Sequence, residues 1–342
     1  MLRHAGWLLF LVSVLGACSG PAGAPAAPAA SSAQAPPPTR VRLIYTSQGA
    51  TQLPIWLAQE EGYFQANGLE VELTFVSGST TATQALLARE ADVVAQGGGA
   101  TVGAALGGAD TVMVATTHGK FVFLLVARPD IADLGALKGH SLGVTRFGTT
   151  SDFATRFVLQ RIGLEPGTDV PLIQTGGNAE TAAALESGAI QAAMVTDVFG
   201  IELRRKGFRE LLDLGDLDIE YSHNGLATTR TFIAEQPDTV RRVLRSVLQG
   251  MGRLVRDPEE SKRVLSRYSQ IDDPTTLEQS WQVHVTKYLR RVPYTTPAAI
   301  RLVLEELAPR YERARTANPE EFYDNRFVEE LDRSGFIAQL YP

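Results

Sequence analysis

The chain has 342 residues, which is enough for one large or two medium domains. Its formal net charge of −6 argues against nucleic-acid binding, because nucleic-acid-binding proteins normally carry a basic surface. The single cysteine, Cys18, excludes an internal disulfide and a cysteine-based metal site.

The N-terminus has the pattern of an export signal. Arg3 and His4 precede an apolar stretch over residues 7–15, which is too short for a permanent membrane span and is typical of a signal-peptide core. The following Leu-Gly-Ala-Cys, ending at Cys18, resembles the lipobox of bacterial lipoproteins, in which the signal is cut before a cysteine that then carries the lipid. We therefore expect a lipoprotein signal peptide over residues 1–17, with an ordinary secretory signal as the alternative.

A Pro/Ala-rich tether is expected over residues 18–39. This segment has almost no large apolar residue, so it cannot bury a core, and its prolines favour an extended chain. Attached to a lipid at Cys18, the tether would hold a folded domain away from a bacterial membrane.

Beyond the tether, short apolar runs alternate with segments of helical periodicity. The expected elements are a strand over 41–45, a helix over 52–61, a strand over 69–73, a helix over 80–90 and a strand over 91–95. Strands that alternate with helices predict an α/β fold with a mostly parallel sheet.

The same arrangement returns later in the chain. The segment 185–193 repeats the spacing of 86–94, and a strand over 142–145 and helices over 152–162 and 181–186 surround it. The apolar run 121–126 could carry the chain from one α/β unit into the other, and the sequence after 227 is mainly helical. We predict a first lobe over 41–127 plus 227–342 and a second lobe over 128–226, with a ligand cleft between them.

Four blocks resemble a known family. They are Glu61-Gly62-Tyr63-Phe64 followed by Gly68-Leu69-Glu70-Val71, the helix-then-strand block 85–94, the block 134–144, and 184–190. Together they are similar to the substrate-binding proteins of ABC importers for nitrate, sulfonate, taurine and thiamine-precursor pyrimidines (NMT1/THI5-like). The resemblance covers residues 41 to about 198.

The resemblance implies a two-lobed periplasmic-binding-protein fold (type II) with two crossing strands between the lobes and a helical C-terminal part. It implies an extracytoplasmic, monomeric, non-enzymatic protein without a cofactor, which captures a small ligand for an ABC permease and ATPase. An enzyme on the same fold, such as a pyrimidine-precursor synthase or a chorismate dehydratase, is the main alternative, and a ligand-binding sensor domain is a third.

Small polar residues follow the expected strands, where ligands of open α/β sheets bind, and several of these loops run into helices whose N-termini suit an anion. Each loop could also be only a capped turn. The candidate ligand-binding residues are Ser47, Gln48, Gln52, Ser77, Ser79, Thr80, Gly98, Gly99, Thr117, His118, Gly148, Thr149, Thr150, Ser151, Asn178 and Asp197.

The sequence motifs do not support nucleotide binding, serine-hydrolase activity or metal binding. No nucleotide-binding glycine motif, no G-x-S-x-G elbow and no metal-ligating histidine spacing occurs, so we expect no catalytic residue and no metal. Arg146 and Lys120 flank the loops and could either pair with an anion or face solvent. Trp56, Phe147 and Tyr221 could be core residues or rim residues of the cleft.

Overall fold

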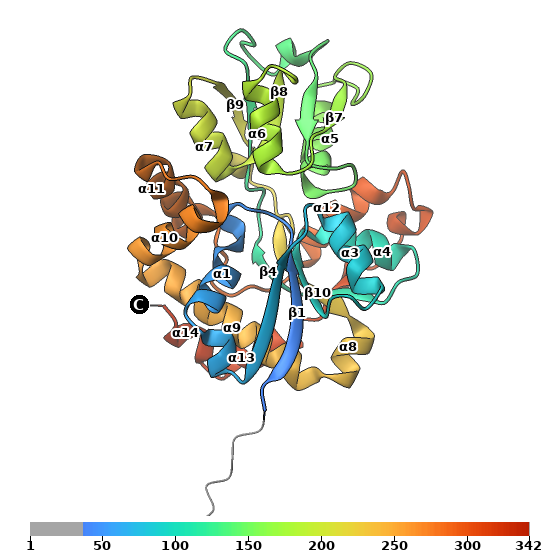
Figure 1. Ribbon diagram of the computed structural model, residues 1–342. Helices are drawn as coiled ribbons and strands as arrows, with labels where there is room; N and C mark the ends of the chain where they lie inside the picture. The colour runs from blue at the N-terminus through green and yellow to red at the C-terminus, as the bar shows by residue number, and fades with distance from the viewer. Residues whose placement is uncertain (1–36, 342) are drawn as a thin grey trace, which may run out of the picture. The chain divides into compact units, whose positions relative to one another are not determined.

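The computed structural model describes residues 37–341, which form one unit. The predicted signal peptide, Cys18 and most of the predicted tether lie outside these residues. The rest of the chain builds two five-stranded sheets, each covered by helices (Figure 1).

The first sheet combines four strands from the start of the described chain with one that follows the strands of the second sheet. Its order is β2-β1-β3-β10-β4, formed by β1 (Thr39–Tyr45), β2 (Leu69–Phe75), β3 (Val93–Gln96), β4 (Thr111–His118) and β10 (Asn224–Thr229). β1 is parallel to β2 and β3, whereas β10 is antiparallel to both β3 and β4. The sheet is therefore mixed.

The second sheet repeats this plan. Its order is β7-β6-β8-β5-β9, formed by β5 (Phe123–Ala127), β6 (Leu142–Val144), β7 (Leu172–Gln174), β8 (Ala192–Thr196) and β9 (Arg209–Asp213). β6 is parallel to β7 and β8, and β5 is antiparallel to β8 and β9. The apolar run that we expected to cross between the units is thus a central strand of the second sheet, although we drew the lobe boundary after residue 127.

Helices follow the strands in both halves. In the first half they are η1 (Ala50–Gln52), α1 (Leu53–Glu60), α2 (Tyr63–Ala66), α3 (Ser79–Leu87) and α4 (Gly98–Leu106). In the second half they are η2 (Gly135–Leu137), α5 (Thr150–Arg161), α6 (Asn178–Glu186), α7 (Asp197–Arg205) and η3 (Leu214–Asp216). We call the first sheet with its helices the first lobe, and the second sheet with α5, α6 and α7 the second lobe.

The C-terminal part is helical, as expected. It contains α8 (Arg230–Glu235), α9 (Pro237–Arg256), α10 (Pro258–Ser269), α11 (Pro274–Val283), a π-helical turn (His284–Tyr288), α12 (Pro297–Leu307), η5 (Glu312–Arg315), η6 (Pro319–Phe322), α13 (Arg326–Arg333) and α14 (Phe336–Gln339). α9 packs on α1 and α12 on α4, so these helices complete the first lobe, whereas α11 lies between α10 and α7 (Figure 1). α11 ends at Val283, and the chain becomes extended after the π-helical turn.

The two large apolar clusters each contain residues of both lobes, and they hold two of the three aromatic candidates. Trp56 is fully buried beneath the first cleft loop, where it stacks on Tyr268 with ring centroids 4.5 Å apart. Tyr221, on the returning segment, stacks on Phe121 at 4.3 Å. Both side chains are therefore core residues, and Phe147 is the exposed one of the three aromatic candidates.

Candidate functional site

Five helices begin at one cavity between the lobes. The chain enters α3 and α4 through Gly78 and Gly97 of the first lobe, and enters α5 and α7 through Thr149 and Thr196 of the second lobe. α6 begins there with Asn178. Each of the five follows the C-terminal end of a strand, so the strand-loop-helix order of the sequence brings all these N-termini to the facing edges of the two sheets.

These helix starts lack a side-chain cap, as do those of α1, α2, α9, α13 and α14. None of the five has a side-chain N-cap hydrogen bond within the described chain. By contrast, α8, α10, α11 and α12 are capped by the side chains of Thr229, Asp257, Asp273 and Thr296. The first N–H groups of a helix have no acceptor within it, so the five N-termini direct free donors and partial positive charge toward the cavity.

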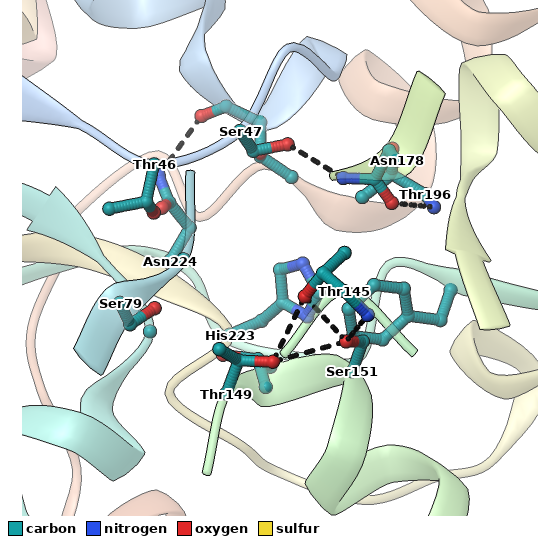
Figure 2. A pocket seen from close by; sticks show the side chains of 15 residues that line it. Thr46, Ser47, Ser79, Thr145, Thr149, Ser151, Asn178, Thr196, His223 and Asn224 are labelled. Carbon is teal, nitrogen blue, oxygen red and sulfur yellow. Dashed lines mark hydrogen bonds between the residues drawn. The ribbon is translucent and has the colours of Figure 1, made fainter. Parts of the chain in front are cut away.

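Hydroxyl and amide side chains line the cavity, which has a volume of about 50 Å³. Figure 2 shows Ser47 and Asn178 on one side of it and Thr149, Ser151 and His223 on the other. Among residues 37–341, no Asp, Glu, Lys or Arg side chain contributes to the lining. The positive potential of the site therefore comes from backbone dipoles and not from charged side chains.

The hydroxyl of Thr196 stands out among the lining groups. Its Oγ1 is buried and has no hydrogen-bond partner in the described structure. Leaving such a group unpaired costs about 1–3 kcal/mol, and it lies at the start of α7 against the cavity. Thr196 is therefore available to a ligand without breaking any bond of the protein.

His223 brings a neutral ring to the cavity. The backbone N–H of Val122 donates to its Nδ1 at 3.3 Å, and the ring meets Phe123 edge-on with centroids 4.7 Å apart. Burial, and next the nearby His284, lower the pKa of His223 to about 3. The neutral ring with Nδ1 as acceptor carries its proton on Nε2, so His223 is a hydrogen-bond donor.

The lobes touch around the cavity. Nδ2 of Asn178 donates to Oγ of Ser47 at 3.3 Å, while its Oδ1 accepts the Thr196 N–H at 3.2 Å (Figure 2). Ser77 donates to the carbonyl of Gly176. The bonds of Asn178 to Ser47 and of Ser77 to Gly176 cross from one lobe to the other, so the structure is a closed form.

The loop at residues 147–152 is built by its own polar groups. Oγ of Ser151 accepts the Thr145 N–H at 3.0 Å and lies 2.8 Å from Oγ1 of Thr145. The Gly148 N–H donates to Asp152 at 2.9 Å, and Gly148 has φ +77°, a conformation that favours glycine. The loop is thus a preformed wall of the cavity.

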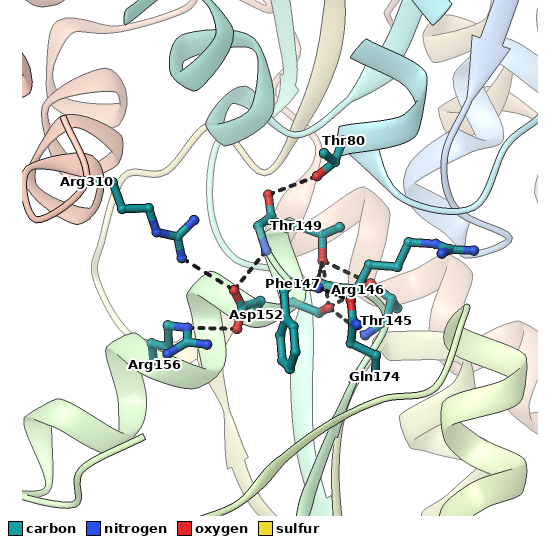
Figure 3. A network of polar contacts seen from close by, with 11 residues as sticks. Thr80, Thr145, Arg146, Phe147, Thr149, Asp152, Arg156, Gln174 and Arg310 are labelled. Atoms are coloured by element: carbon teal, nitrogen blue, oxygen red, sulfur yellow. Dashed lines mark hydrogen bonds and ion pairs between the residues drawn. The ribbon is translucent and has the colours of Figure 1, made fainter. Parts of the chain in front are cut away.

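Asp152 connects this loop to both lobes. The carboxylate is fully buried, lies 2.8 Å from Nε of Arg156 on its own helix, and lies 3.8 Å from the guanidinium of Arg310 in the first lobe (Figure 3). Asp152 does not cap α5, because the N-cap position has no side-chain bond.

The structure brings six of the predicted site residues to the cavity wall. They are Ser47, Ser79, Thr149, Thr150, Ser151 and Asn178. Near the wall, Gln52 is buried and bonds Asn224 at 3.1 Å, and Thr80 lies 3.5 Å from the Gly148 carbonyl. Ser77, Gln48, Gly98 and Gly99 lie in loops or helix starts beside these groups. Ligand contact at all of these positions stays a prediction.

Three predicted residues lie away from the cavity wall. Thr117, His118 and Asp197 are buried in a hydrogen-bonded chain at the crossing between the lobes, and they are absent from the lining. Of the two cations that we considered, Arg146 donates to the Ser77 carbonyl at 3.2 Å and Lys120 pairs with Asp218 at 3.2 Å. Neither cation lines the cavity.

Several lining residues are not among the candidates. Thr46 and Thr196 belong to loops that we expected at the cleft, and Thr51 and Thr145 lie just outside such loops, so a wider choice around each strand end would have included all four. His223 and Asn224 lie at the start of β10, an antiparallel strand that enters the site from the opposite direction. The rule that ligands bind after strands cannot find such residues.

No helix between residues 37 and 341 has the length and apolarity needed to cross a membrane. In the same residues, no group of three or more His, Cys, Asp or Glu side chains is placed to hold a metal ion.

Comparison with known proteins identifies the family. The NMT1/THI5-like family model matches residues 50–261. The chain is 26% identical over 279 residues to riboflavin-binding protein RibY of Chloroflexus aurantiacus, covering 74% of each chain. Its fold is similar to that of the alkanesulfonate-binding protein SsuA of Xanthomonas axonopodis bound to MOPS, with a TM-score of 0.70, 19% identity, and coverage of 85% of this chain and 100% of that one.

A second solved structure supports the same fold. The periplasmic nitrate-binding protein NrtA of Synechocystis PCC 6803 matches with a TM-score of 0.71 and 14% identity, covering 90% of this chain and 92% of that one. These likenesses confirm the predicted two-lobed periplasmic-binding-protein fold. Since the family model spans more than half of the chain, the protein belongs to the NMT1/THI5-like family.

Proposed function

We propose that the protein is an extracytoplasmic solute-binding protein that captures a small anion between its lobes and delivers it to an ABC permease. The sulfonate, nitrate and small carboxylate classes fit best. One observation carries this proposal: five uncapped helix N-termini from both lobes converge on a small cavity lined by hydroxyl groups.

The charge of the lining favours an anion of low charge. Backbone N–H groups and hydroxyls can satisfy the oxygens of a nitrate or sulfonate without a buried cation. A multiply charged ligand would need cationic side chains, since buried charges must be paired, and the lining within the described chain offers none. The neutral His223 adds a donor without adding charge.

The size of the cavity favours a small ligand. About 50 Å³ corresponds to roughly three or four water-sized groups, which suits a compact head group. RibY is named for riboflavin, whose three fused rings need more room than this closed cavity offers. We therefore place this chain with the small-anion binders and make riboflavin a test ligand.

The remaining parts of the proposal concern place and partners. The lipobox at Cys18 supports attachment to a bacterial membrane, with the Pro/Ala-rich segment as a tether. The names of SsuA, NrtA and RibY support an extracytoplasmic, non-enzymatic binding role. We propose that the protein acts as a monomer, which presents one ligand at a time to a permease and its ATPase.

A thermal-shift series with methanesulfonate, taurine, nitrate, acetate and riboflavin tests the proposal. A ligand at 100 times its Kd adds about 2.7 kcal/mol to the free energy of unfolding, which gives a visible shift. We expect at least one small anion to raise the Tm and riboflavin to leave it unchanged. A shift with riboflavin and with none of the anions would overturn the assignment.

A matched pair of variants tests whether the thermal shift arises from ligand binding in the cavity. Thr196→Val and Thr155→Val each remove a buried hydroxyl that has no partner in the described structure, but only Thr196 lines the cavity. Neither variant breaks a hydrogen bond of the protein and each removes an unpaired buried hydroxyl, so without ligand neither should melt below the wild type. Thr196→Val should weaken binding of the active anion, and equal binding by the two variants would contradict the site.

A further inference from the structure

A second cavity lies at the seam between the lobes, and we call it the seam pocket. Its volume of about 340 Å³ is in the range of small-molecule sites. α5 of the second lobe lines it with Phe153, Arg156, Phe157 and Gln160, whose spacing places them on one face of the helix. Among residues 37–341, the seam pocket and the ligand cavity share no lining residue, so they are separate sites.

The opposite wall of the seam pocket comes from the first lobe. α12 and the turn after it contribute Leu302, Glu305, Glu306, Pro309 and Arg310. The first four of these repeat the spacing of the α5 wall, so two helices from different lobes present matching faces to the pocket. A molecule in the seam pocket would therefore contact both lobes.

One part of the seam pocket is apolar. Phe153 is buried, and its ring centroid lies 5.9 Å from that of the half-buried Phe157. Across the pocket, Leu302 is half-buried and Pro309 is exposed. Aromatic rings pack well on such rings and on aliphatic side chains, so this part suits a compact apolar body.

Two guanidinium groups at the pocket have hydrogen-bond donors to spare. Arg156 uses its Nε for Asp152 at 2.8 Å, and Arg310 lies 3.8 Å from the other oxygen of Asp152, which is beyond hydrogen-bond distance (Figure 3). Within the described chain, the terminal nitrogens of both groups make no hydrogen bond. The single Asp152 carboxylate balances one of the two positive charges, so a second carboxylate would complete the pairing.

Glu306 adds a further polar group without a partner. Within residues 37–341, no group hydrogen-bonds to its carboxyl, which faces Arg310, Arg156 and Asp152. Burial raises the pKa of Glu306 to about 8, although Arg310 opposes this effect. At pH 7 the carboxyl is therefore mostly neutral and offers an O–H donor instead of a competing negative charge.

We propose that the seam pocket is a second small-molecule site, which binds an aromatic monocarboxylate. The ring lies against Phe153, Phe157 and Leu302, and the carboxylate accepts hydrogen bonds from Arg156 and Arg310. A single negative charge matches the one guanidinium charge that Asp152 leaves unbalanced.

The seam pocket adjoins the ligand cavity through α5. The first turn of this helix contributes Thr150 and Ser151 to the ligand cavity, and the next turns line the seam pocket. An aromatic carboxylate that ties α5 to α12 would favour the closed arrangement and so assist capture of the first ligand. This coupling rests on the proposed function, whereas binding in the seam pocket does not.

Titration of 4-fluorobenzoate with the full chain, followed by ¹⁹F NMR, tests the occupant. Its ring needs more room than the closed ligand cavity of about 50 Å³ offers. We expect saturable binding, and at least tenfold weaker binding of 4-fluorobenzyl alcohol, which keeps the ring and lacks the charge. No binding of 4-fluorobenzoate, equal binding of the alcohol, or tighter binding of 4-fluorobenzylamine would overturn the proposal.

Variants test the location. Gln160→Trp places a bulky side chain at the seam pocket from an exposed position of α5, and Gln65→Trp alters an exposed glutamine of α2 outside both cavities. We expect Gln160→Trp to weaken 4-fluorobenzoate binding at least fivefold and Gln65→Trp to leave it unchanged. Arg310→Gln, which removes one guanidinium, should weaken it at least threefold. Wild-type affinity in Gln160→Trp or in Arg310→Gln would overturn the assignment.

Two further titrations separate the seam pocket from the ligand cavity. Thr196→Val should keep the wild-type affinity for 4-fluorobenzoate, because Thr196 lines the ligand cavity only, and a loss would mean that the carboxylate binds there and would overturn the proposal. A saturating amount of the anion with the largest thermal shift should lower the Kd of 4-fluorobenzoate at least twofold. An unchanged Kd would refute the coupling. Failure of every anion to bind would count against the proposed function and leave the 4-fluorobenzoate titrations to decide the seam pocket.

Discussion

Gly49 lies where the first lobe meets the second, and an added methyl group should act as a wedge between them. A Cβ at this position would lie 2.6 Å from Oγ1 and 3.1 Å from Cβ of Thr196. Ordinary contact begins at 3.4 Å, so the closed lobes would have to separate by 0.3 to 0.8 Å at this point. Gly49 has φ −90° and ψ 170°, which alanine adopts freely, so each lobe alone should tolerate the change.

The expected effect of Gly49→Ala is a loss of affinity without a loss of fold. Overpacking costs about 1–3 kcal/mol, and here it acts on the closed form, which corresponds to a roughly 5- to 150-fold weaker Kd. Calorimetric titration with the anion that gives the largest thermal shift measures the Kd, and a melt without ligand measures the fold. Gly103→Ala is the matched control, since its Cβ would meet Leu307 at an ordinary 3.7 Å within the first lobe. Wild-type affinity in Gly49→Ala, or an equal effect of both variants, would refute the wedge.

Two further predictions concern stability. Gly250 lies where α9 packs on α1, and a methyl group added there would clash with the Pro54 carbonyl and lie 3.1 Å from the Ala58 nitrogen. Gly250→Ala should therefore lower the free energy of unfolding by about 1–3 kcal/mol in urea melts. An unchanged urea midpoint would contradict this packing. Burial raises the pKa of Glu306 to about 8, so stability should fall as pH rises from about 4.5 to 8, and Glu306→Gln should remove this fall while the exposed Glu305→Gln keeps it. Identical pH profiles of the two glutamine variants would refute the role of Glu306.

The sequence was sufficient for the fold because the fold depends on local patterns. Neighbouring residues determine apolar strands such as 142–144 and the helices that follow them after a glycine-containing loop. The strand-loop-helix order then places the strand ends and helix starts at one edge of a sheet. The sequence could not assign β5 to one of the two sheets, because an apolar run looks the same in either sheet. The pairing of β5 with β8 and β9 depends on residues that are distant in the sequence.

The residues of the candidate site also fall into those that local sequence patterns predict and those that they do not. Ser47, Ser79 and Asn178 follow strands and reach the cavity wall as the pattern predicts. His118 is the last residue of β4 and was chosen by the same rule, yet its ring contacts His284, which is 166 residues away in the sequence. His223 reaches the cavity because the second crossing enters it in reverse, and no local pattern marks that direction.

Asp152 offers the sharpest test of whether the site holds an anion. Its buried carboxylate lies in the first turn of α5, whose N-terminus faces the cavity, so its charge opposes an anion while Arg156 and Arg310 offset it (Figure 3). Asp152→Asn should cost about 1–3 kcal/mol of stability, since it leaves two partly exposed guanidinium groups without their partner. The same variant should bind the anion several-fold more tightly, and Arg310→Gln, which leaves the carboxylate less compensated, should bind it more weakly. Stability by urea melts and affinity by titration would therefore move in opposite directions in Asp152→Asn. Weaker binding in Asp152→Asn together with tighter binding in Arg310→Gln would mean that the ligand held by this loop is not an anion.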